Sequence, residues 1–191
     1  MKLCFATNNP NKLAEIQDIL GDQFELVGLQ DIGCEEELAE DQTTLEGNSL
    51  QKAQYVYNQY GVNCFADDTG LEITSLEGEP GVYSARYAGD QRNNGDNMAL
   101  VMERMEGKPD RAAQFRTVIT LIVDGEQKQF EGVAKGEIIT EQLGKEGFGY
   151  DPIFKPEGYQ KTFAEMSRIE KNKISHRGRA IRHLIDYLKP H

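Results

Sequence analysis

Four short stretches of the 191-residue sequence combine residue types that could do chemistry. Two of them, ATNNPNK at 6–12 and EKNKISHRG at 170–178, place basic side chains at expected helix starts. FADDTGL at 65–71 offers two adjacent carboxylates, and GFGYDPIF at 147–154 combines glycines, aromatic rings and a single carboxylate. Together they could bind a phosphate chain, a metal ion and a flat ring.

The basic residues at two expected helix starts indicate an anionic ligand. Lys12 lies in the first turn of a helix, where unpaired N–H groups and partial positive charge disfavour a lysine. Ser175 is the expected N-cap of the last helix, so His176 and Arg177 repeat this conflict, and Lys171 lies just upstream. A shared polyanion such as a metal-bound triphosphate would remove both conflicts. A common Asn/Pro turn and a solvated basic helix face are the alternatives.

The carboxylate pair at Asp67 and Asp68 is a candidate metal site. The pair is expected to end an apolar strand, with Thr69-Gly70 turning the chain. Carboxylate oxygens are hard ligands that suit Mg²⁺, and alternation along a strand should direct only one of the two into a given site. The acidic run upstream adds carboxylates that include Glu36, Glu40 and Glu46; most of this run is expected to be a solvated surface, but one glutamate could complete the site. A pair of turn-capping aspartates is the alternative.

The stretch GFGYDPIF is typical of a pocket wall rather than a core strand, because it contains Gly149 and Pro152. Phe148 or Tyr150 could stack on a flat ring, and Asp151 could accept a hydrogen bond from a ring N–H. Beside a triphosphate, that ring would be a nucleobase. An Asp-Pro turn packed beneath the core is the alternative.

Composition excludes several classes of function. The net charge of −11 argues against a nucleic-acid polymer as partner, because such binding needs a basic face. The three cysteines are odd in number and lack CxxC spacing, which is typical of a reducing cytosol and argues against a zinc site. Since no segment approaches 18 apolar residues, we expect a soluble, cytoplasmic protein without a membrane partner.

Hydrophobic periodicity predicts an α/β fold with a mixed sheet. The expected helices cover 12–20, 48–60, 94–106 and 175–188, and the expected strands cover 2–7, 62–68, 113–125 and 126–138. Asn9, Pro10 and Gly21 are the expected N-cap, first residue and C-terminal glycine of the first helix. Asp124-Gly125 predicts an antiparallel hairpin. No repeat or linker divides residues 1–191, which we expect to form a single domain.

Five motifs in register resemble the inosine triphosphate pyrophosphatase family. They are TNNPNK, FADDTGLEI, GVYSARYAG, GFGYDPIF and SHRGRAI, and the resemblance runs from residue 6 to about residue 188. It implies an elongated mixed β-sheet with flanking helices, two lobes around a central nucleotide cleft, and a homodimer. It also implies Mg²⁺-dependent hydrolysis of ITP, dITP and XTP to the monophosphate and pyrophosphate, which cleanses the nucleotide pool.

The resemblance also implies roles for individual residues. Asp68 would be the general base beside the metal, with Glu40 as second metal ligand and Thr69 touching the substrate. The phosphates would be held by Thr7, Asn8, Asn9, Pro10, Asn11, Lys12 and Lys171. The base pocket would be formed by Phe148, Gly149, Tyr150, Asp151, His176 and Arg177. The sequence departs from the family pattern at Asn8, where many members have glycine, at Thr69, where many have serine, and in the acidic segment before TTLEGN.

Hydrogen-bond complementarity gives an expected base preference. Donors near His176 and Arg177, paired with Asp151 as acceptor, would favour a 6-oxo purine and leave adenine mismatched. Two other functions are compatible with such a cleft. One is a Maf-like pyrophosphatase acting on pyrimidine or modified nucleotides, and the other is a non-catalytic nucleotide sensor. The acid pair disfavours the sensor, because binding alone would not need an acid facing phosphates.

Overall fold

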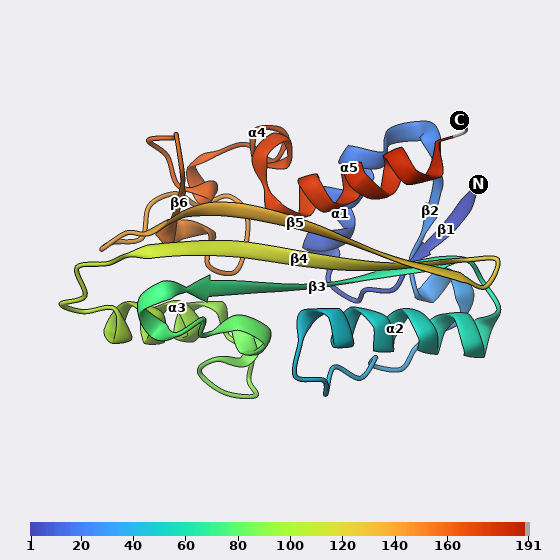
Figure 1. The fold of residues 1–191 in the computed structure, drawn as a ribbon, viewed down its shortest axis with the longest axis horizontal. Coiled ribbons are helices and arrows are strands. Elements are labelled where there is room, and N and C mark those ends of the chain that lie inside the picture. Colours follow the sequence, from blue (N-terminus) through green and yellow to red (C-terminus); the bar gives the residue numbers. More distant parts are fainter. Residues whose placement is uncertain (190–191) are drawn as a thin grey trace. The chain divides into compact units, whose positions relative to one another are not determined.

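The computed structural model describes residues 1–189, and these form two compact units. Unit 1 contains Met1–Asp68, Thr117–Gly132 and the described residues from Arg177 onward. Unit 2 contains Thr69–Arg116 and Val133–His176. Each unit is therefore assembled from segments that lie far apart in the sequence (Figure 1).

Within residues 1–189, six strands form a mixed sheet in the order β2-β1-β3-β4-β5-β6. β1 pairs in parallel with β2 and β3, whereas β5 and β6 are antiparallel. The strands are β1 (Lys2–Phe5), β2 (Glu25–Val27), β3 (Cys64–Ile73), β4 (Ala112–Val123), β5 (Glu126–Ile138) and β6 (Phe154–Pro156). Asp124 and Gly125 connect β4 to β5 with φ angles of 51° and 86°, the left-handed conformations that a tight hairpin turn requires. The predicted mixed α/β class is confirmed.

The described residues form five α-helices beside the sheet: α1 (Pro10–Leu20), α2 (Leu45–Tyr60), α3 (Asn94–Arg104), α4 (Arg168–Ile174) and α5 (His176–Leu188). α1 begins as its sequence predicts, because the Asn9 side chain accepts hydrogen bonds from two backbone N–H groups of the first turn and Pro10 is the first residue. Among the described residues, no helix is both long and apolar enough to cross a membrane.

Unit 1 has two hydrophobic cores, one on each face of its strands. Leu3, Phe5 and Phe65 face the core that contains α1 and α5, whereas Cys4 and Ala66 face the core that contains α2. Figure 1 shows α1 and α5 on one side of the strands of this unit and α2 on the other. Adjacent residues of a strand therefore contact different helices.

Unit 2 has one hydrophobic core, built from α3, the parts of β3, β4 and β5 in this unit, and the segment from 150 to 166. Phe115 packs against two other rings of this core. The centroid of its ring lies 4.7 Å from that of Phe154 and 5.9 Å from that of Phe163. The segment after the GFGYDPIF stretch is thus anchored by aromatic packing.

Two local predictions need correction. Thr69-Gly70 does not turn the chain, because β3 continues to Ile73. Position 70 requires glycine because the backbone of Gly81 passes close to it. A Cβ there would lie 2.5 Å from the carbonyl oxygen of Gly81. The short elements β2, β6 and α4 were not predicted, and each has only three to seven residues, too few to show a hydrophobic period.

Candidate functional site

The TNNPNK turn forms a fully capped helix start in unit 1. The Thr7 hydroxyl accepts a hydrogen bond from the Asn9 N–H at 3.1 Å. The Asn9 side chain in turn accepts from the N–H groups of Asn11 at 2.9 Å and Lys12 at 3.3 Å. Asn8 and Pro10 are exposed. The turn is therefore rigid and presents its remaining polar groups to solvent.

Asp67 is the ion-pair partner of Lys12. The Lys12 ammonium lies 3.0 Å from Asp67 Oδ1, and the Arg177 guanidinium donates to Asp67 Oδ2 at 3.1 Å. Arg177 also pairs with the buried carboxylate of Glu15 on α1. Burial would raise the pKa of Asp67, but the three cations Lys12, Arg177 and Lys52 outweigh it and hold the pKa well below its usual range.

Asp68 faces the opposite side of the strand, as alternation predicts. Its Oδ2 accepts a hydrogen bond from the Asn48 side-chain amide on α2 at 2.9 Å. Burial raises the pKa of the Asp68 carboxyl, although the nearby Lys52 and Lys12 ammonium groups oppose that shift. A carboxylate with a raised pKa is a better proton acceptor than an ordinary aspartate. Of the two carboxylates, Asp68 is therefore the better proton acceptor.

Glu40 joins this group through a buried lysine. The Lys52 ammonium on α2 bonds to Glu40 Oε1 at 2.5 Å and to the backbone oxygen of Asp67 at 2.6 Å. Burial would raise the pKa of Glu40, but the charge of Lys52 and its hydrogen bond lower the pKa overall. Glu40 is therefore an ionised carboxylate. Lys52 links it to the backbone of Asp67 on β3.

The donor set fits a magnesium ion carried by a substrate. Among residues 1–189, no three His, Cys, Asp or Glu side chains gather into a complete metal site. Mg²⁺ is commonly bound by one or two carboxylates, with phosphate oxygens and water as the other ligands. Asp68 and Glu40 could supply such a pair. Both are partly or fully buried and both have a hydrogen-bond partner that orients them.

In unit 2, Asp151 organises the GFGYDPIF stretch. Its Oδ2 accepts hydrogen bonds from the Phe148 N–H at 3.1 Å and from the Lys171 ammonium at 2.7 Å. The same ammonium lies 4.8 Å from the centroid of the Phe148 ring. Lys171 was predicted to hold phosphates, but the structure groups it with two predicted base-pocket residues. A half-buried aromatic ring, a cation and a carboxylate are thus assembled in one place.

The glycines of this stretch differ in their surroundings. Gly147 has φ +71°, and a Cβ there would lie 2.1 Å from Asp151 Oδ2. Gly149 has φ +62° with nothing near its Cβ position. Tyr150 is buried, and its hydroxyl donates to the Ser84 carbonyl oxygen at 2.6 Å. Of the two candidate stacking rings, Phe148 is therefore the one that remains partly exposed.

The predicted site residues divide between the two units. Unit 1 contains Thr7 to Lys12, Glu40, Asp68 and Arg177, and unit 2 contains Thr69, Phe148 to Asp151, Lys171 and His176. His176 is buried in unit 2, with its ring stacked 4.6 Å from the Phe115 centroid. Thr69 is half-buried on β3.

Three residues in unit 1 were missed by the sequence analysis: Asn48, Lys52 and Glu15. All three are buried and polar. Asn48 bonds to Asp68, Lys52 to Glu40 and Glu15 to Arg177, and each of these partners is a predicted site residue. Asn48 and Lys52 lie four residues apart in a predicted helix, so the sequence did indicate that they share one face of that helix. Their burial could not be read from the sequence, because polar residues on a helix normally face solvent.

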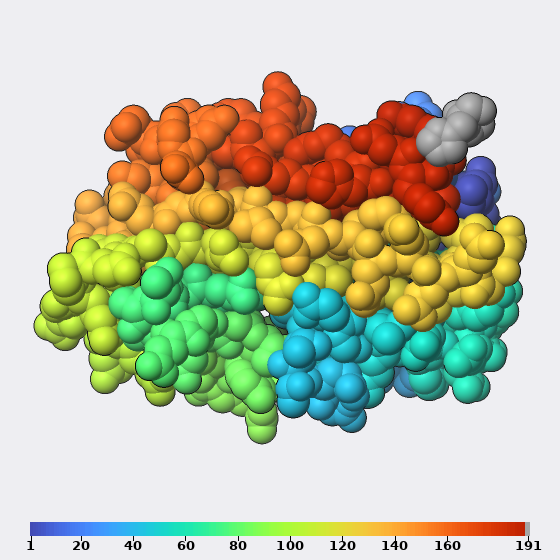
Figure 2. All heavy atoms as spheres, in the orientation of Figure 1, coloured from blue at the N-terminus to red at the C-terminus, as the bar shows by residue number. Residues whose placement is uncertain are grey.

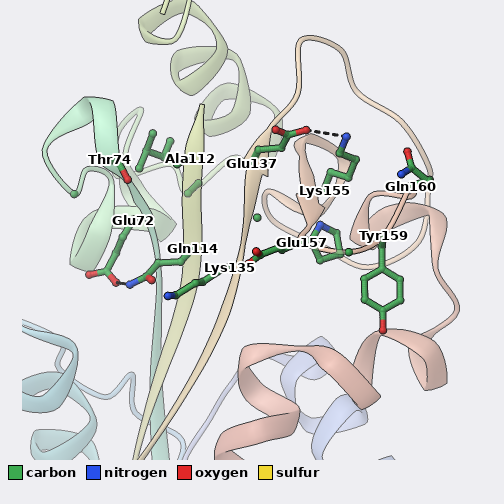
Figure 3. Close-up of a pocket in the computed structure, with 16 residues that line it drawn as sticks. Glu72, Thr74, Ala112, Gln114, Lys135, Glu137, Lys155, Glu157, Tyr159 and Gln160 are labelled. Atoms are coloured by element: carbon green, nitrogen blue, oxygen red, sulfur yellow. Dashed lines mark hydrogen bonds and ion pairs between the residues drawn. The ribbon is translucent and has the colours of Figure 1, made fainter. Parts of the chain in front are cut away.

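Unit 2 also has a hollow of about 870 Å³ beside the ends of β5 and β6 (Figure 3). Its lining includes Glu72, Gln114, Lys135, Glu137 and Lys155. Lys155 pairs with Glu137 at 2.8 Å, and Gln114 donates to Glu72 at 3.0 Å. None of the predicted site residues lines this hollow, so it is separate from the groups described above.

A mixed α/β fold that holds oriented carboxylates beside a buried lysine is compatible with a hydrolase that acts on nucleotides, and the sequence relatives show that class. The chain belongs to the Ham1 family, whose family model matches residues 3–187. This match confirms the resemblance predicted from the five motifs.

Individual relatives extend over the whole chain. The dITP/XTP pyrophosphatase of Flavobacterium psychrophilum is 54% identical over 189 residues, covering 99% of this chain and 100% of that protein. The structure of a HAM1 protein from Coxiella burnetii is 37% identical, with a TM-score of 0.90 and 98% coverage of both chains. The nucleoside-triphosphatase, or dITP/XTP pyrophosphatase, of Mycobacterium abscessus is 40% identical, with a TM-score of 0.78, covering 97% of this chain and 99% of that one.

Proposed function

We propose that this protein is a dITP/XTP pyrophosphatase that also hydrolyses ITP. It cleaves the bond between the α and β phosphates, so that water adds to the α phosphorus and pyrophosphate leaves. Relatives that are more than 50% identical over nearly the whole chain and are named dITP/XTP pyrophosphatases support the reaction class predicted from the sequence. The single structural observation that carries the proposal is the Asp68 and Glu40 carboxylate pair, held by Asn48 and Lys52.

The residues of unit 1 supply the hydrolytic chemistry. Asp68 accepts a proton from the attacking water, which its raised pKa favours. Lys12 offsets negative charge on the phosphates as the α–β bond breaks. The ion pair of Lys12 with Asp67 holds its ammonium group beside the Asp67–Asp68 pair.

A magnesium ion is the metal that suits this donor set. Asp68 and Glu40 would hold it, and the ion would offset repulsion between these acids and the phosphates. The ionised state of Glu40, maintained by Lys52, suits it for this role.

The residues of unit 2 supply base recognition. Phe148 stacks on the purine, and the Lys171 ammonium donates to the 6-oxo group. Adenine has an amino group at that position. This amino group and the Lys171 ammonium are both hydrogen-bond donors, so neither would have an acceptor. In this proposal Lys171 acts on the base rather than on the phosphates, which its contacts with Asp151 and Phe148 support.

The homodimer and the cytoplasmic location remain predictions from family resemblance and composition. Sedimentation of the purified protein at micromolar concentration tests the first, and fractionation of the source cells tests the second.

The substrate assignment is tested by pyrophosphate release across a panel of nucleoside triphosphates with Mg²⁺. We expect kcat/KM for ITP and XTP to exceed that for ATP by about 10²-fold or more, because a closed pocket leaves mismatched polar groups unpaired. Equal turnover of ATP, or a preference for a pyrimidine, would contradict the assignment. Tight binding without turnover would identify a nucleotide sensor.

A further inference from the structure

Asn48 connects two parts of unit 1 that carry the candidate metal ligands. It lies in the first turns of α2 and is 1% exposed. Its Oδ1 accepts a hydrogen bond from the Gln42 backbone N–H at 2.9 Å, and its Nδ2 donates to Asp68 Oδ2 at 2.9 Å. These opposite roles fix the orientation of the amide, because only oxygen can accept from the N–H and only nitrogen can donate to the carboxylate.

Gln42 ends the segment that carries Glu40. This segment, residues 36–42, forms no helix or strand, and we call it the Glu40 segment. It runs alongside α2 within unit 1 (Figure 1, Figure 2). Its position is therefore determined by side-chain contacts and not by a backbone ladder.

These contacts follow one face of α2 in order. The helix residues Asn48, Gln51, Lys52 and Tyr55 have the spacing i, i+3, i+4, i+7 of a single helix face. Counting back along α2, Tyr55 bonds to Glu36, Lys52 to Glu40, Gln51 to Asp41 and Asn48 to Gln42. The helix thus holds the Glu40 segment in a single antiparallel register.

Asn48 differs from the other three residues because it also bonds to Asp68. We infer that Asn48 is a positioning residue that joins the Glu40 segment to Asp68 and sets the spacing of the two carboxylates before metal or nucleotide binds. This inference rests on the proposed function and deepens it. Residues that orient metal ligands without touching the metal commonly change metal affinity or activity by about 10- to 100-fold when replaced.

The test compares Asn48→Ala with Asn58→Ala. Asn58 is an exposed asparagine on the same helix, so the control makes the same truncation away from the Glu40 segment. For Asn48→Ala we expect kcat for ITP to fall by about 10-fold or more even at saturating Mg²⁺, because Asp68 loses its donor. We also expect the half-saturating Mg²⁺ concentration to rise, because Glu40 and Asp68 no longer hold a fixed spacing.

Two further measurements do not depend on turnover. Mn²⁺ binding to the nucleotide-free protein, followed by electron paramagnetic resonance, should weaken by about 10-fold in Asn48→Ala and stay unchanged in Asn58→Ala. Amide hydrogen exchange should accelerate at Gln42. Gln51→Ala, which loosens only the Glu40 segment, should raise the Mg²⁺ requirement while leaving kcat at saturation unchanged.

The possible outcomes separate the inference from the proposed function. If the unmodified protein hydrolyses no nucleoside triphosphate, the proposed function fails. If it hydrolyses ITP and Asn48→Ala behaves like Asn58→Ala in both kcat and Mn²⁺ affinity, the positioning role is wrong. Should Asn48→Ala fail to fold, Asn48→Ser tests the contact with Asp68, and Gln51→Ala still tests the contact with the segment. Normal kinetics in both would overturn the inference.

Discussion

Asp67 and Asp68 are chemically identical neighbours that have different surroundings. Asp67 contacts Lys12 and Arg177 on one face of β3, whereas Asp68 contacts Asn48 on the other. The cations lower the pKa of Asp67, and burial raises the pKa of Asp68. Alternation along a strand is enough to give two neighbouring carboxylates different partners and opposite pKa shifts.

Asp68→Asn removes charge and basicity while preserving shape. We expect kcat for ITP to fall by about 10²-fold or more, with nucleotide binding retained in part. Raising the Mg²⁺ concentration should not restore the rate, because the missing function is proton acceptance. Steady-state pyrophosphate release with titrated Mg²⁺ measures this. A rate that recovers with Mg²⁺ would show that Asp68 acts only as a metal ligand.

Phe148→Ala tests the stacking role of the half-buried ring. A base stacked on an aromatic side chain contributes roughly 1–3 kcal/mol to binding, so Kd for ITP should rise by about 5- to 150-fold. Calorimetric titration with a non-hydrolysable ITP analogue measures the change, and Phe148→Tyr, which keeps the ring, serves as the control. An unchanged Kd in a folded Phe148→Ala protein would exclude the ring from the base site.

At the scale of elements, the loop from Gly147 to Asp151 depends on one glycine more than on the other. Both Gly147 and Gly149 have positive φ, so alanine strains the backbone at either position. Only at Gly147 would the added Cβ collide with the Asp151 carboxylate, which holds the Phe148 N–H and Lys171. We therefore expect Gly147→Ala to weaken ITP binding at least ten times more than Gly149→Ala.

That pair of variants is compared by Kd for the same ITP analogue, with urea unfolding to confirm that both proteins are folded. Equal Kd values would mean that the geometry of the Asp151 carboxylate does not govern base binding.

The sequence identified the long elements because their periods are clear. The first helix was predicted with its N-cap, its proline and its terminal glycine, since each residue acts locally. The β4–β5 hairpin was predicted for the same reason. The continuation of β3 through Gly70 was not predicted. Position 70 requires glycine because the backbone of Gly81, eleven positions further along the chain, lies too close for a Cβ.

The candidate site shows the same limit. The carboxylates and the basic residues were found by type and spacing, and the family resemblance suggested their roles. Lys52 and Asn48 were missed because their importance comes from burial and from partners in other elements. The Lys171 contact with Asp151 spans 20 positions and likewise could not be derived from local pattern.

At the scale of the whole molecule, the buried ion pairs of unit 1 link its stability to its site. Asp67 is fully buried between Lys12 and Arg177, and Arg177 also pairs with Glu15. Removing one partner of a buried pair commonly costs about 3–5 kcal/mol, because the remaining charges stay buried. We expect Asp67→Asn to lower the free energy of unfolding by roughly this amount, measured by urea denaturation at pH 7.

Asp68→Asn provides the matched comparison at the neighbouring position. The raised pKa of Asp68 means that its ionised form is less stable in the folded protein than in the unfolded chain. Replacing it with a neutral amide should therefore leave the free energy of unfolding unchanged or increase it. A loss of stability similar to that of Asp67→Asn would contradict the separation of the two roles.

The antiparallel register between α2 and the Glu40 segment has an evolutionary consequence. Tyr55 pairs with Glu36 and Lys52 with Glu40 through their side chains, and Gln51 bonds to both the side chain and the backbone N–H of Asp41. A change on one side therefore alters the partner required on the other, so these positions should covary among descendants of this sequence. A single-residue insertion within the contacting part of α2 would rotate one half of that face by about 100° relative to the other. Substitutions can accumulate here in compensating pairs, whereas changes of length in this part of the helix cannot.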